Sequence, residues 1–174
     1  MALQYAAISF MVLMGLSHAT TVRVGLAHGR GSAEGVRKAG WISIALGTGF
    51  MALTGILFWM VPEVLVGLFI DPLPPHNQQS FALAVTFLSM AALFQLADGA
   101  QVVSAAVLRG LSDTAMPMML AILGYWGIGL PIAYVCGFVL DMRGTGIWAG
   151  LASGLIAVAL TLVIRFALRD RLAI

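Results

Sequence analysis

The sequence predicts an all-α integral membrane protein, and three observations predict it. Hydrophobic residues make up 61% of the 174 residues and charged residues only 9%, whereas soluble domains have roughly 45–50% and about 25%. The mean hydropathy is +1.01. The apolar stretches are continuous rather than alternating, which favours transmembrane helices over the strands of a membrane barrel.

Five apolar runs are long enough to cross a hydrocarbon core, which needs roughly 20 residues per helix. Their expected ranges are 1–22, 39–61, 80–108, 114–140 and 144–164. The first run lacks the basic segment and cleavage site of a signal peptide, so we interpret it as a span. The whole of 1–174 is expected to form one unit, without a second domain.

The connections between the runs also have expected structures. Residues 23–38 contain four glycines and four basic residues, which predicts a flexible or tightly turned loop. Pro62 stands at a helix-start position and is followed by apolar residues at helical spacing. We therefore expect residues 62–70 to form a short helix at the membrane interface.

The basic residues predict the orientation of the bundle. Eight of the nine lie in the connections on one side of the expected spans, and Arg143 alone lies on the other side. By the positive-inside rule, the N-terminus is external and the C-terminus is cytoplasmic. An external N-terminus with five spans and no signal peptide is unusual, so we expect further chain upstream.

Small residues and a proline mark two of the expected spans. Pro131, with Gly127 and Gly129 beside it, interrupts the fourth span and predicts a kink or hinge. The fifth span contains a glycine stripe that predicts close helix packing: Gly146, Gly150 and Gly154.

Asp98 is the only charged residue within the third expected span. Helical geometry places Gln95 and Gln101 on the same face, together with Phe94. Asp98 is roughly 15 Å of helix rise from Arg109, so the carboxylate is expected to lie deep in the membrane. An aspartate at the centre of a membrane helix costs roughly 2.5–3.5 kcal/mol.

Two explanations for Asp98 remain open. A carboxylate that is neutral when empty and ionised when it holds a cation suits coupling to H⁺ or Na⁺, with amide or carbonyl oxygens completing the shell. Alternatively, Asp98 is structural and caps a broken helix or bonds to a neighbouring one. Gln4, near the external end of the first span, is a further candidate cavity residue or simply faces headgroups.

Several functional classes lack support in the sequence. It contains no nucleotide-binding P-loop, HExxH, CxxC or GxSxG motif. Nothing predicts an enzyme or an organic cofactor, so any pumping is expected to use an ion gradient. The net charge of +2 is too small to suggest nucleic-acid binding.

Three stretches resemble the multidrug and toxic compound extrusion (MATE) family, in particular its NorM-type members. They are "ATTVRVGLAHGRG", "FQLADGAQVVSAAVLRGLSDT" and "YWGIGLPIAYVCG". The most specific part is the spacing from Asp98 through Gln101 to the Arg109–Gly110 and Asp113–Thr114 pairs.

This resemblance implies a fold and a function. Family members have twelve helices in two six-helix lobes and sit as multi-pass proteins in the bacterial inner membrane. They export cationic, amphipathic drugs or dyes in exchange for Na⁺ or H⁺. The sequence is similar to the eighth through twelfth helices, so the bilayer, the N-terminal lobe and the preceding helix are the implied partners. Asp98 resembles the cation-binding aspartate of the tenth helix, a Na⁺ ligand in sodium-coupled members.

Two departures limit what the resemblance implies. NorM-type members pair this aspartate with a glutamate on the seventh helix, which has no counterpart here. Phe94 stands where some members have a tyrosine. The expected ion site is therefore incomplete, and we do not expect the fragment to transport alone.

Three alternatives stay open at this point. A related flippase for lipid intermediates would have an arginine-rich cavity, whereas the expected spans contain no Arg or Lys. A membrane scaffold or assembly subunit would use Asp98 to pair with a partner helix. A truncated gene product would have no activity.

Overall fold

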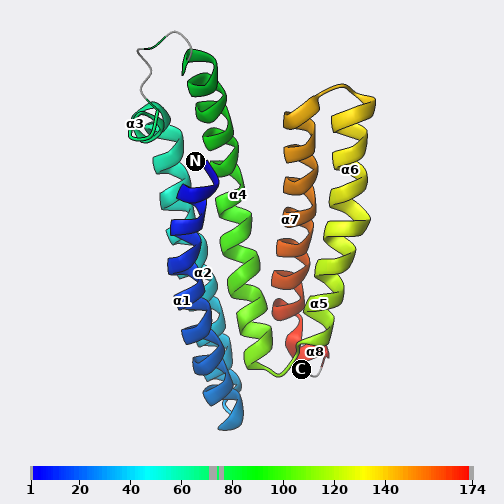
Figure 1. The fold of residues 1–174 in the computed structure, drawn as a ribbon. Helices are drawn as coiled ribbons and strands as arrows, with labels where there is room; N and C mark the ends of the chain where they lie inside the picture. The colour runs from blue at the N-terminus through cyan, green and yellow to red at the C-terminus, as the bar shows by residue number, and fades with distance from the viewer. Residues whose placement is uncertain (1, 71–73, 75–76, 173–174) are drawn as a thin grey trace.

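The computed structural model describes residues 2–70, 74 and 77–172, and all regular structure in these ranges is helical. The elements are α1 (Ala2–Gly29), α2 (Ala33–Met60), α3 (Pro62–Gly67), α4 (Gln78–Gly110), α5 (Ala115–Ile122), η2 (Leu123–Gly129), α6 (Leu130–Tyr134), η3 (Val135–Val139), α7 (Arg143–Ala167) and α8 (Arg169–Leu172). Consecutive long helices run in opposite directions, with α3 and α8 at opposite ends of the bundle (Figure 1). Five helices in the described ranges are long and apolar enough to cross a membrane, counting α5 to η3 as one.

α4 is the helix on which the bundle is built. α1 and α2 pack against it from one side and α7 from another (Figure 1). The apolar core follows α4 and draws buried residues from all four helices: Leu13, Val24, Met51, Val103, Val107, Leu162 and Phe166. The Thr21 hydroxyl also donates a hydrogen bond to the Ala106 carbonyl (3.1 Å), which ties α1 to α4.

The basic segment 23–38 is mostly helical, which corrects the expectation of a flexible or tightly turned loop over this whole range and leaves a tight turn only at residues 30–32. α1 continues to Gly29 because Val24 is fully buried in the core, and α2 begins at Ala33. The chain reverses at Gly31, whose φ of +67° favours glycine. Ser32 then caps α2 by accepting a hydrogen bond from the Gly35 N–H (3.1 Å).

The longer helices also change the place of six basic residues. Arg23 lies within α1, Arg37 and Lys38 within α2, Arg109 within α4, and Arg143 and Arg165 within α7, rather than between spans. The expectation that the spans hold no Arg or Lys is therefore wrong for the helices as they form. Each of these basic residues is within about two turns of its helix end, where a long side chain reaches the headgroup region.

α5, η2, α6 and η3 form one continuous but irregular helix against α7. Two π-helical segments flank α6, which contains Pro131 near its start. The glycine stripe of α7 faces this helix, as its spacing predicts. A Cβ at Gly150 would overlap the backbone of Ala133, so only glycine allows the two backbones to come this close.

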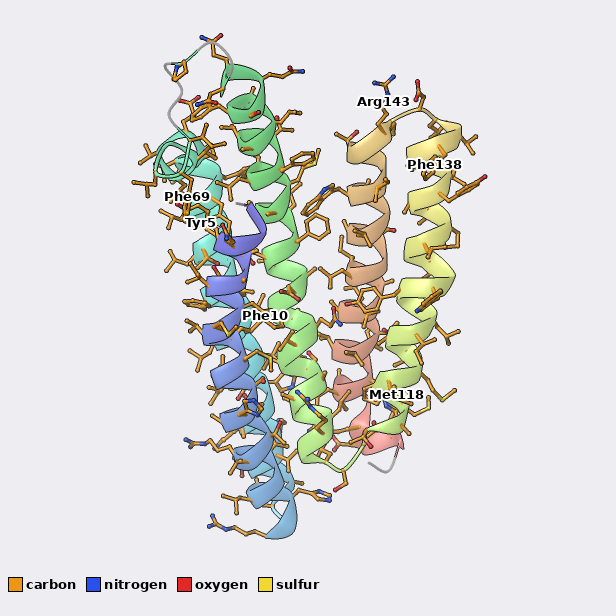
Figure 2. All side chains as sticks on the ribbon, viewed as in Figure 1. Tyr5, Phe10, Phe69, Met118, Phe138 and Arg143 are labelled. Carbon is orange, nitrogen blue, oxygen red and sulfur yellow. The ribbon has the colours of Figure 1, made fainter. Side chains whose placement is uncertain are left out.

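The short α3 lies at the end of the bundle opposite to the α1–α2 turn. It ends at Gly67, earlier than the expected residue 70, and a hydrogen-bonded turn follows it. Tyr5 of α1 packs edge-on against Phe69 at a centroid distance of 5.5 Å (Figure 2). Its hydroxyl donates to the Leu65 carbonyl (2.8 Å), which fixes α3 to the first turns of α1.

Candidate cation-binding site

Asp98 lies on α4 one turn after Phe94, whose ring contacts α7, and three residues before Gln101, which bonds to η2. It is partly buried, and within the described part of the chain its carboxylate has neither a hydrogen bond nor an ion pair. Twelve residues separate it from Gly110, the last residue of α4, which corresponds to about 18 Å of helix rise. A carboxylate this far from a helix end has little access to the headgroups, so its charge depends on what else comes within reach.

The two glutamines near Asp98 do not form one continuous stripe with it. Gln95 is 2% exposed and turns towards α2, where its amide nitrogen donates to the Thr54 hydroxyl (3.2 Å). Gln101 turns towards η2, where its amide oxygen accepts a hydrogen bond from the Tyr125 hydroxyl (2.7 Å). Asp98 lies on α4 between these two bonds, each of which links α4 to a different neighbouring helix.

Aromatic rings define the α7 side of this region. Phe94, one turn before Asp98, meets Trp148 of α7 edge-on with centroids 5.0 Å apart. Phe87 stacks on the same indole at 6.0 Å. Phe94 therefore packs between helices in the described structure and supplies an aromatic ring, without a hydroxyl, beside the carboxylate.

Oxygen atoms near Asp98 come from η2 as well as from α4. Tyr125 of η2 donates a hydrogen bond to the amide oxygen of Gln101, which lies three residues after Asp98 on α4. Among the described residues, no group of three or more acidic, histidine or cysteine side chains is placed to hold a metal ion. One carboxylate with neutral oxygen donors is chemically suited to a proton or a monovalent hard cation rather than to a transition metal.

Gln4 is separate from this region. It is exposed in the first turns of α1, next to Tyr5, which packs at the α3 end of the bundle. Tyr5 packs against the small cluster that contains Leu88 of α4, ten residues before Asp98. The structure therefore does not bring Gln4 together with Asp98.

Of the candidate hinge residues, Gly127 and Gly129 lie within the π-helical segment η2, and Pro131 follows in α6. Gly127 has open space around it, whereas Gly129 is buried against Gly150 and Gly154 of α7. Pro131 is exposed and has no N–H to donate. A proline also clashes with the carbonyl four residues earlier, and an irregular turn just before it relieves that clash. The three residues thus share one local irregularity but have different packing.

Sequence reasoning missed Thr54 and Tyr125. Both are polar residues within apolar runs, which is a detectable signal, but their partners are on other helices and no spacing rule connects them. Only the packing of α2 and η2 on α4 shows that each bonds to a glutamine near Asp98.

Comparisons with known proteins agree on a family. A sequence model of the MatE family matches residues 1–135. The chain is 53% identical, over 99% of its length, to a probable multidrug resistance protein NorM from Mesorhizobium japonicum, of which it covers 37%. It is 41% identical, over 97% of its length, to multidrug resistance protein NorM from Burkholderia vietnamiensis, of which it covers 36%.

A solved structure supports the fold. The crystal structure of the eukaryotic MATE transporter AtDTX14 matches 96% of this chain with a TM-score of 0.86 at 20% identity, and the match covers 36% of that protein. The chain thus spans a little over a third of the length of the relatives that it matches. On the family model and the NorM relatives together, the chain belongs to the MATE family.

Proposed function

We propose that this chain is part of a multidrug efflux antiporter in which Asp98 binds the coupling cation, Na⁺ or H⁺. The observation that carries the proposal is a carboxylate on α4, far from either helix end, without a hydrogen bond or ion pair in the described structure. The NorM relatives of this chain are named for multidrug resistance. The exported compounds would be cationic and amphipathic.

The proposed mechanism uses the cost of charge in an apolar bundle. An ionised Asp98 is unfavourable in a low-dielectric region this far from the ends of α4, and a bound cation removes that cost. Cation binding therefore biases the bundle between two conformations and releases a cationic substrate. The irregular helix around Pro131 is the proposed moving part, because π-helical turns and a missing N–H make it easier to bend than α4.

The proposed location is the bacterial inner membrane, with the C-terminus in the cytoplasm. The basic residues support this orientation, since Arg165, Arg169 and Arg171 follow or end α7 on the same side as the α1–α2 turn. The covered share of the relatives suggests that transport also needs the helices of the other lobe and the helix before α1. We propose that the chain alone does not complete an antiport cycle.

The test compares exchange with and without the carboxylate. The chain is produced alone and joined to the first seven helices of a NorM relative, and dye-driven Na⁺ and H⁺ exchange is measured in vesicles. We expect exchange only in the joined protein and at least a tenfold loss for Asp98→Asn. Asp141→Asn, which changes an exposed carboxylate in the turn between η3 and α7, serves as the matched control and keeps the exchange.

Two results would contradict the proposal. Exchange by Asp98→Asn at the unmodified rate would show that the carboxylate does not couple the cation. A variant that fails to insert or assemble, with exchange per inserted molecule unchanged, would instead support the scaffold alternative. Exchange by the chain alone would contradict only the requirement for the remaining helices.

A further inference from the structure

A groove between α1 and α2 is not used by the proposed antiport. It has a volume of about 740 Å³ and lies at the end of the bundle where the Gly31–Ser32 turn joins the two helices. Three basic residues line it: Arg23 and Arg30 from α1 and Lys38 from α2. Arg23 and Arg30 are seven residues apart, so they lie on one face of α1, two turns from each other.

The groove changes from charged to apolar along its length. Arg30 is next to the turn, Arg23 and Lys38 are each about two turns from it, and the far end is lined by Leu16 and Leu46. Leu16 is fourteen residues from Arg30, which is about 21 Å along the helix. Since α1 and α2 are both candidate spans, the apolar end points towards the middle of the membrane and the basic end towards its surface.

The two arginines are available to an anionic ligand. Both are exposed and, within the described part of the chain, neither has a hydrogen bond or ion pair. Lys38 pairs with Glu34 at 2.8 Å, but both side chains are about two-thirds exposed, and such a pair on a helix surface contributes little. The basic end therefore keeps a net positive charge.

We propose that this groove binds one anionic phospholipid. The guanidinium groups of Arg23 and Arg30 contact its phosphate, and an acyl chain lies along Ile42 and Leu46. A phospholipid fits better than a free phosphate because the far end of the same groove is apolar. That end is lined by residues of α1 and α2, which are both candidate membrane spans. Basic pockets between membrane helices are suited to such headgroups, and each arginine near the surface adds to the attraction.

The test measures lipid retention by the purified 174-residue chain with native mass spectrometry. Dioleoyl phosphatidylglycerol, dioleoyl phosphatidylcholine and inorganic phosphate are titrated separately. We expect phosphatidylglycerol to bind at least tenfold more tightly than phosphatidylcholine. The double variant Arg23→Gln with Arg30→Gln should weaken phosphatidylglycerol binding about tenfold or more. The double variant Arg23→Lys with Arg30→Lys keeps both charges and should retain most of the binding.

A matched control removes the same charge elsewhere. Arg109 and Arg171 are exposed and lie outside the groove, so Arg109→Gln with Arg171→Gln should change binding less than threefold. An equal loss in both double variants would show a diffuse charge effect and overturn the proposal. Displacement of the lipid by millimolar inorganic phosphate would overturn it too, because the site would then select a free anion.

A second measurement needs no substitution. Phosphatidylglycerol with a photoreactive acyl chain is incorporated with the unmodified chain into nanodiscs, and cross-linked peptides are mapped. Cross-links concentrated on the groove walls, at Leu16, Ile42 or Leu46, support the proposal. Cross-links spread over all helices, or none in the groove because another segment covers it, would overturn the proposal even if the double variant does not fold.

Discussion

The two halves of the bundle are packed by different means. α1, α2 and α4 enclose a core of large buried side chains such as Leu13, Met51 and Val107. In the irregular helix from α5 to η3, by contrast, the buried residues are Pro117 and three glycines. These glycines face the glycine stripe of α7, so that half is joined backbone to backbone.

This difference shows where the bundle resists bending. In a membrane, apolar side chains gain little by leaving lipid, so helix association depends on close packing. Interdigitated side chains on α4 favour one arrangement, whereas smooth glycine surfaces and π-helical turns leave the other half easier to move. Asp98 lies on α4 one turn after Phe94, whose contact with Trp148 joins the two halves.

The largest effect is expected from adding one methyl group to the glycine stripe. Gly150→Ala places a Cβ in the backbone of Ala133, and helix separation should cost about 3 kcal/mol or more. The measurement is the free energy of unfolding in mixed micelles, followed by circular dichroism. The effect should be confined to the α5–α7 half, as monitored by Trp148 fluorescence.

Gly127→Ala is the matched control for this substitution. No atom of the described residues lies within 4 Å of a Cβ at position 127, so the same change should be neutral or stabilise by up to about 1 kcal/mol. If both variants lose the same stability, the two glycines matter for their backbone conformation and not for the close approach of two helices. The proposed difference in packing between the two halves is then wrong.

A smaller effect is expected at the ion pair that joins the halves at one end. Arg165 of α7 donates to Asp113, in the α4–α5 turn, at 2.6 Å, and the side chains are 17% and 9% exposed. Asp113→Asn leaves the arginine largely buried and unpaired, which should cost about 2 kcal/mol of unfolding free energy. The cost is below that of a fully buried pair because Arg165 keeps some contact with solvent.

The opposite end provides the comparison. Asp141 and Arg143 are 3.6 Å apart and more than four-fifths exposed. Asp141→Asn should therefore change the unfolding free energy by less than about 0.5 kcal/mol, in the same micelle titration. Equal costs at both ends would mean that the Arg165–Asp113 pair does not hold the halves together.

The sequence predicted the parts of this fold that depend on local pattern. Continuous apolar runs predicted the helical membrane class, and the spacing of Gly146, Gly150 and Gly154 predicted a close contact that the structure shows. It failed at 23–38, because glycine content suggested a loop while the burial of Val24 extends the helix. Local composition cannot show that a residue has a core to enter.

The candidate site shows the same limit. Periodicity grouped Gln95 and Gln101 with Asp98 on one helix face, and the structure turns the two amides to different helices. A helix face is wide enough to contact two neighbours at once, so shared periodicity does not mean a shared partner. The position of Asp98 followed from sequence, whereas Tyr125 could be found only from packing.

Among the contacts between helices, the smallest effect is expected at the hydrogen bond between Tyr125 of η2 and Gln101 of α4, near Asp98. Tyr125→Phe removes the donor to Gln101, and a single interhelical bond in a membrane protein is worth about 0.6 kcal/mol. Unfolding in mixed micelles should detect this loss, and Tyr134→Phe is the control because Tyr134 is exposed. In the joined transporter, Tyr125→Phe should alter cation affinity less than Asp98→Asn does, since it changes a neutral oxygen donor and leaves the charge in place. A larger loss of cation affinity than for Asp98→Asn would assign the main cation contact to the Tyr125–Gln101 pair. That pair, rather than the Asp98 carboxylate, would then couple the cation to transport.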